Sequence, residues 1–114
     1  MFNYINVTVG DLAENKTYYL AKIPSKHRLK KAYLIIDSGA GDDSNYIDGV
    51  KLQAGSNDVN EAVSTKDLSN GVNELSFTEV TYGAGTVYKL VTGAATGTPS
   101  VSGVKVQLVF EPVL

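Results

Sequence analysis

The sequence contains no cysteine and no tryptophan, and it has a single histidine and only three prolines. Without cysteine the chain has no disulfide, no thiolate nucleophile and no cysteine-liganded zinc site. No apolar run approaches the roughly 18 residues of a membrane helix. The N-terminal residues MFNYINVTVG also lack the charged start and apolar stretch of a signal peptide. We therefore expect a soluble protein that is made in the cytoplasm and does not bind a membrane.

The size and composition are those of one globular domain covering residues 1–114. Hydrophobic residues make up 43% of the chain and charged residues 19%, which favours a packed core over disorder. The formal net charge is −2, whereas a protein that coats nucleic acid is normally basic. We expect no nucleic-acid partner.

Apolar residues recur at every second position through most of the chain, which is the period of a β-strand. The clearest case is the last strand, where Val104, Val106 and Leu108 share one face and Val109 is the exception. Residues 29–36 become apolar on both faces, which is typical of a central strand. The alternation predicts strands at 4–9, 17–23, 29–36, 50–53, 74–82, 86–91 and 104–113.

Short strands separated by turn residues predict an all-β chain, an antiparallel β-sandwich or jelly roll of about seven to eight strands. The connections at 39–49, 56–73 and 92–103 are long for plain hairpins. The least regular segment is 56–73, whose middle could form one helical turn capped by Asn57 or Asp58.

The sequence shows no set of residues that predicts catalysis. His27 is expected to be an ordinary turn residue, and no nucleophile elbow or phosphate-binding loop is present. We therefore expect that the chain is not an enzyme and needs no cofactor. One open alternative is a structural cation on the acidic loop, because calcium favours several carboxylates on a flexible segment; the candidate ligands are Asp37, Asp42, Asp43 and Asp48.

Tyrosine is abundant, with seven residues in the chain. A tyrosine side chain supplies amphipathic contact area in interfaces, and it is equally common on a half-exposed strand face. Tyr46 is the best candidate for a contact residue, because it lies within the polar loop at 39–49.

The layout of the chain resembles that of the small capsid decoration, or cement, proteins of tailed phages. An N-terminal strand and a polar turn lead to a strand that ends in Ile23-Pro24 with a basic turn. An apolar strand and an Asp/Gly loop follow, AYLIIDSGAGDDSNYIDG, and then a short strand, VKLQAG. The chain closes with two strands around a loop of small residues, TVYKLVTGAATGTPSVSGVKVQLVFE. The segment 56–73 follows the pattern least.

The resemblance implies a structural virion protein on the outer capsid surface. Its partner would be the major capsid protein, it would often be a homotrimer, and it would stabilise the shell without covalent chemistry. A different reading of the same strands is a small β-sandwich binding module of a phage fibre, a baseplate or a carbohydrate-binding protein. The absence of tryptophan weakens the sugar-binding form of that alternative.

Half of the ten positive charges fall in one short stretch before the apolar strand: Lys22, Lys26, Arg28, Lys30 and Lys31. By default such a run is a solvated turn that discourages edge-to-edge strand pairing. Capsid exteriors are commonly acidic, so it could instead steer docking. Alternation places Lys26, Arg28 and Lys30 on one side of the strand, opposite Leu29 and Lys31. We hypothesise that the first three face the capsid.

Overall fold

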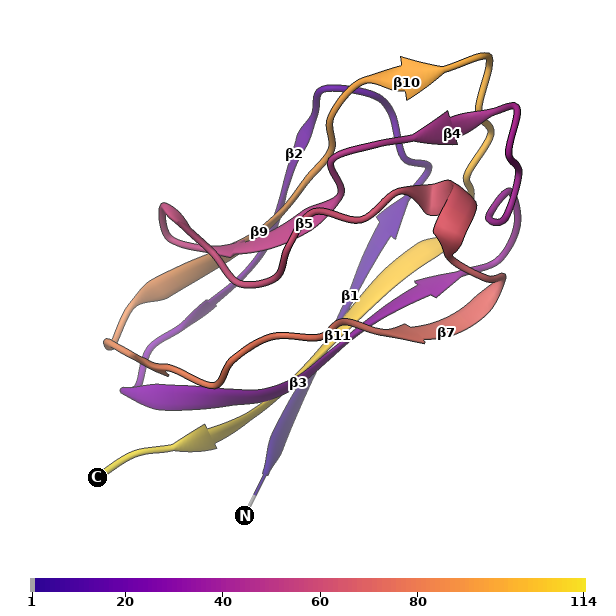
Figure 1. Cartoon of the computed structure of the whole chain (residues 1–114). Coiled ribbons are helices and arrows are strands. Elements are labelled where there is room, and N and C mark those ends of the chain that lie inside the picture. The colour runs from indigo at the N-terminus through magenta and orange to yellow at the C-terminus, as the bar shows by residue number, and fades with distance from the viewer. Residues whose placement is uncertain (1) are drawn as a thin grey trace.

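The computed structural model describes residues 2–114, which form two curled antiparallel sheets that face each other (Figure 1). The first sheet has the order β1 (Asn3–Gly10), β11 (Val104–Pro112), β3 (His27–Ile36) and β7 (Gly71–Glu74), with β8 (Thr81–Tyr82) also on β3. The second has the order β2 (Thr17–Ile23), β9 (Thr86–Val91), β5 (Lys51–Ala54) and β6 (Asn57–Asp58). A separate pair joins β4 (Tyr46–Ile47) to β10 (Ala95–Thr96).

Eight of these strands follow the order of a jelly roll. In chain order they are β1, β2, β3, β5, β6, β7, β9 and β11. The first sheet then holds the first, eighth, third and sixth strands, and the second sheet holds the second, seventh, fourth and fifth. Jelly rolls bring eight antiparallel strands into two sheets in this way. The predicted all-β sandwich or jelly roll is confirmed, and β4, β8 and β10 are short additions to it.

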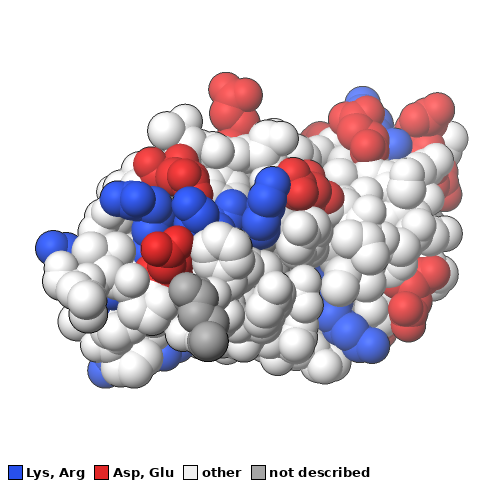
Figure 2. Space-filling model, turned by 90° about the horizontal axis from the view of Figure 1, so that it is seen from below, with Lys and Arg blue, Asp and Glu red and all other residues white. Residues whose placement is uncertain are grey.

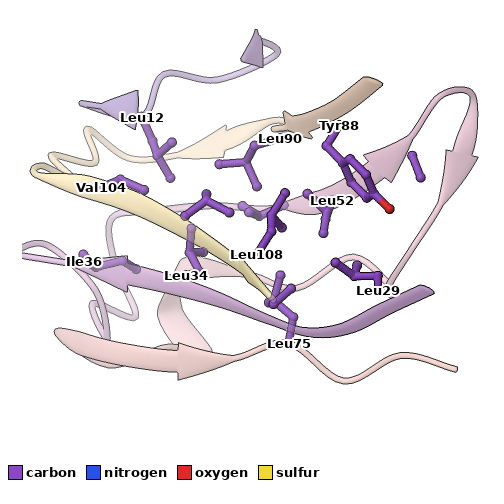
Figure 3. Packing of buried hydrophobic residues seen from close by; sticks show 14 of the residues in the cluster. Leu12, Leu29, Leu34, Ile36, Leu52, Leu75, Tyr88, Leu90, Val104 and Leu108 are labelled. Atoms are coloured by element: carbon purple, nitrogen blue, oxygen red, sulfur yellow. The ribbon is translucent and has the colours of Figure 1, made fainter. Parts of the chain in front are cut away.

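The core fills the space between the two sheets. In β11 the side chains of Val104, Val106 and Leu108 point inward and are buried, as their alternation predicts. Figure 3 shows Leu108 from the first sheet beside Leu52 and Leu90 from the second. The core lies on the inner face of each sheet, and the opposite face of each sheet points outward.

The predicted strand at 74–82 is wrong in its middle. β7 ends at Glu74 and β8 begins at Thr81, and residues 75–80 between them are not in a strand. Glu74 pairs with Tyr33 and Thr81 pairs with Arg28, so residues 75–80 lie opposite residues 29–32 of β3, which are fewer. The surplus residues cannot stay in register with β3, so the segment leaves the ladder.

The predicted helical turn in 56–73 exists but has a different cap. A single 3-10 turn spans Thr65–Asp67, and the side chain of Ser64 accepts a hydrogen bond from the backbone N–H of Lys66. The expected caps belong instead to β6 (Asn57–Asp58), which pairs with β5. Their backbone groups are already used in that ladder, so they do not begin a helix.

His27 is not the turn residue that the sequence predicts. It is the first residue of β3 and is fully buried. Its Nδ1 lies 2.8 Å from the backbone oxygen of Ser25, and its Nε2 lies 2.7 Å from the hydroxyl of Tyr88. A carbonyl oxygen only accepts, so Nδ1 donates; in the neutral imidazole Nε2 then accepts from the hydroxyl. Burial first, and the nearby Tyr82 second, raise the pKa of Tyr88, so that hydroxyl keeps its proton.

Replacing Tyr88 by phenylalanine is expected to destabilise the fold by about 2 kcal/mol, because Nε2 of His27 would be left buried without a partner. Chemical denaturation followed by circular dichroism measures this. Tyr18→Phe is the matched control, since the hydroxyl of Tyr18 bonds to backbone groups at the exposed surface. Equal losses in the two variants would contradict the role given to the buried pair.

Candidate interaction surface

The basic residues of β3 lie at a bulge. Val109 of β11 pairs with Lys31, and the next residue, Phe110, pairs with Leu29, so Lys30 is the extra residue. A bulge lets two consecutive side chains point to the same face of a sheet. The prediction that Lys31 shares the side of Leu29 is therefore wrong: Leu29 is buried, whereas Lys30 and Lys31 both lie on the outer face.

A groove of about 740 Å³ runs across the outer face of the first sheet. It crosses β1, β11, β3 and β7 and is closed on one side by the irregular segment 75–80. Its lining is mostly apolar: Phe2, Tyr4, Tyr33, Ile35, Val72, Phe77 and Val109, with Lys30, Lys31, Glu79 and Gln107. We call this set the groove face.

Several large apolar side chains on the groove face are exposed to solvent. Phe2 is 48% exposed, Tyr4 62% and Val72 67%. Single exposed apolar residues are normal, but several in one patch with a polar rim mark an interaction site. Figure 2 views the molecule from below and shows a row of Lys and Arg side chains with Asp and Glu beside it, next to a broad uncharged surface.

The charges of the groove face are paired. The Nζ of Lys30 lies 2.6 Å from Oε1 of Glu79, and that of Lys31 lies 3.5 Å from Oε2 of Glu74. The hydrogen bond from Lys30 is the main reason that the pKa of Glu79 is below its usual range. Lys30 also lies 6.0 Å from the ring centroid of Phe2. The rim is therefore polar but close to neutral, and it does not repel an approaching surface of either sign.

The structure only partly brings the predicted contact residues together. Lys30 lines the groove, and Arg28 lies on the same outer face, where it donates a hydrogen bond to Thr81. Lys26 is exposed in the turn before β3 and is outside the groove. Tyr46 is elsewhere, on β4, half-buried with the ammonium of Lys66 4.6 Å from its ring centroid.

Sequence reasoning missed most of the apolar residues of the groove. Two signals were present: Val109 breaks the alternation of its strand, and residues 29–36 are apolar on both faces. Both are typical of strands that are buried on both sides. In the folded chain only one side is covered, so Ile35 and Val72 lie on an open face.

The acidic loop is organised by hydrogen bonds within the protein. Oδ1 of Asp42 accepts from the backbone N–H groups of Ser44 and Asn45, at 2.9 and 3.1 Å, and these contacts help to lower the pKa of Asp42. The Asn45 side chain accepts in turn from Thr98 N–H, at 2.8 Å. Within residues 2–114 no three His, Asp or Glu side chains are grouped as metal ligands, and the structural cation stays an untested prediction.

No helix in residues 2–114 is long and apolar enough to span a membrane. Comparison with known proteins gives no match to a family model, a curated protein sequence or a solved structure.

Proposed function

We propose that this chain is a structural protein that binds the surface of a larger protein assembly through the groove face and catalyses no reaction. The observation that carries the proposal is the groove itself, an apolar hollow with exposed Phe2, Tyr4 and Val72. Interfaces have an apolar, aromatic centre and a polar rim, which is the composition of this face. Covering it would remove that apolar surface from water.

We further propose that the assembly is an icosahedral phage shell, the partner its major capsid protein and the location its outer surface. The support is the resemblance in layout to decoration proteins. The jelly roll is compatible with this role but is shared with lectins and other proteins, so the fold by itself does not assign a function. The resemblance also implies a homotrimer; this stays untested, and we do not include it in this proposal.

The mechanism is mechanical. One groove face makes a weak contact, but a symmetric shell repeats the same contact many times. A chain or oligomer that touches neighbouring capsid subunits gains avidity, because the second contact forms at high effective concentration. Such bridges oppose separation of the subunits, and no covalent bond is formed or broken.

The direct test is binding to shells assembled from the major capsid protein without this chain. Reversing three charges together, with Lys26→Glu, Arg28→Glu and Lys30→Glu, is expected to abolish co-sedimentation with the shells at moderate salt. The acidic exterior of a capsid would then be repelled, and Glu79 would lose its partner Lys30.

The control for this variant reverses three lysines near or on the second sheet, Lys16, Lys22 and Lys89. Both variants then carry the same net charge, so a difference between them reports the position of the charge. Unchanged occupancy of the shells by the first variant would reject the docking role of its three residues. Equal loss in both variants would show that only net charge matters.

A sugar-binding module is the second candidate, because aromatic rings line the groove together with an amide. Tyr4, Tyr33 and Gln107 could stack against a sugar ring and bond its hydroxyls. Titration of the purified chain with soluble polysaccharides, followed by changes in the NMR signals of these residues, separates the two candidates. Saturable binding of a glycan with no binding to shells would favour the module.

A further inference from the structure

Strand β1 has a free edge. On one side it pairs with β11 from Asn3 to Gly10, and no other strand in residues 2–114 pairs with its second side. A free edge presents unpaired backbone N–H and C=O groups along its length, and these can pair with a strand of another chain.

The other edges of the two sheets carry the usual protection against such pairing. β2 contains Lys22 and is followed by Pro24, β6 has two residues and includes Asp58, and β7 has four residues and ends in Glu74. Charge, proline and shortness are the devices by which proteins blunt an edge. β1 has eight residues, NYINVTVG, with neither charge nor proline. It is the one long edge in the described chain that lacks these devices.

We propose that a second copy of this chain pairs with β1, so that two β1 strands run antiparallel across a two-fold axis at Asn6. This register uses the strand up to the irregularity between Thr8 and Gly10. It sets Tyr4 opposite Thr8 of the second copy on the outer face and Ile5 opposite Val7 of the second copy on the inner face. Aromatic and β-branched residues make favourable cross-strand pairs, and the absence of charge removes like-charge repulsion.

The pairing would also extend the groove face. Phe2 and Tyr4 line the groove and lie at the β1 side of the sheet. Joining two copies edge to edge brings these side chains of both copies toward the shared axis and places the two grooves on one continuous sheet. The paired charges at Lys30 and Lys31 leave this combined face close to neutral. The inference does not depend on the proposed function.

Cysteine cross-linking tests the register, because the natural chain has no cysteine. Opposite residues of antiparallel strands have Cα atoms about 4.5–5.5 Å apart, which suits a disulfide. Asn6→Cys on the axis is therefore expected to form a disulfide-linked dimer under mild oxidation at low protein concentration. In the matched control Thr8→Cys, the two cysteines would lie roughly 13 Å apart, and the chain is expected to stay unlinked. Both positions are exposed, so neither change disturbs the core.

Analytical ultracentrifugation of the unmodified chain gives an independent measurement. A concentration-dependent dimer that is lost in Asn6→Lys is expected, since that change sets two lysines opposite each other. A monomer at all concentrations, a trimer, or equal cross-linking of both cysteine variants would overturn the inference. These measurements use the purified chain alone. A dimer that fails to bind shells would reject only the proposed function, and a shell-binding monomer would reject only the pairing.

Discussion

Replacing Val72 by glutamate is expected to lower the affinity for the partner shell about 100-fold, a loss near 2.8 kcal/mol. Val72 lines the groove and is 67% exposed in the free chain, so the substitution leaves the fold intact. When the shell covers the groove, a carboxylate at this position loses water without gaining a partner, which is costly. Glu74 lies nearby on the same strand and adds repulsion. Quantitative co-sedimentation with shells measures the change.

The control for this prediction is Tyr19→Glu. Tyr19 is 74% exposed and belongs to β2 of the second sheet, away from the groove face. Its replacement adds the same charge and removes a larger apolar side chain, yet the affinity is expected to stay unchanged. A stronger loss in Tyr19→Glu than in Val72→Glu would place the binding surface on the second sheet and contradict our assignment.

Replacing Gly39 by alanine is expected to destabilise the fold by about 3 kcal/mol, the largest effect on stability that we predict. Gly39 has a φ of +94°, and an added Cβ would lie 2.7 Å from the carbonyl carbon of Ser100 and 2.9 Å from the Cα of Val101. These are backbone atoms, which cannot swing aside as a flexible side chain can. Thermal and chemical denaturation measure the loss.

Gly55→Ala separates this clash from the cost of the backbone conformation alone. Gly55 also has a positive φ, +62°, but an added Cβ would meet nothing within 4 Å. Its replacement is expected to cost about 1 kcal/mol, from the left-handed conformation only. Equal losses of stability in the two alanine variants would contradict this explanation. They would show that the close approach of the Ser100 backbone does not require a glycine at position 39.

The residues of the core were predictable wherever an alternation was regular. Val104, Val106 and Leu108 repeat at a period of two and face inward in β11. The period of a strand is a local property, set by the backbone, and needs no knowledge of neighbours. The single-domain all-β chain and its strands follow from that rule and from the turn residues between them.

The groove face was not predictable by the same rule. An apolar residue on the second face of a strand indicates burial only if another layer covers that face. Val109 is buried at the floor of the groove, whereas Ile35 on the same outer face is only half-buried because the groove beside it is open. Whether the face of a sheet is covered depends on how strands that are far apart in the sequence pack against each other. The local sequence of one strand does not contain this information.

The sequence by itself therefore determined the all-β fold class, the positions of most strands and the inward-facing residues of β11. These features depend on residues that are close together along the chain. Only the tertiary structure decided three further features. The bulge at Lys30 turns Lys31 outward, the packing of β9 against β3 buries His27 on Tyr88, and the open first sheet collects apolar residues from four strands. Each of these three features forms where strands that are far apart in the sequence pack or pair together. Their relative position and register depend on the whole fold, so neighbouring residues in the sequence do not determine them.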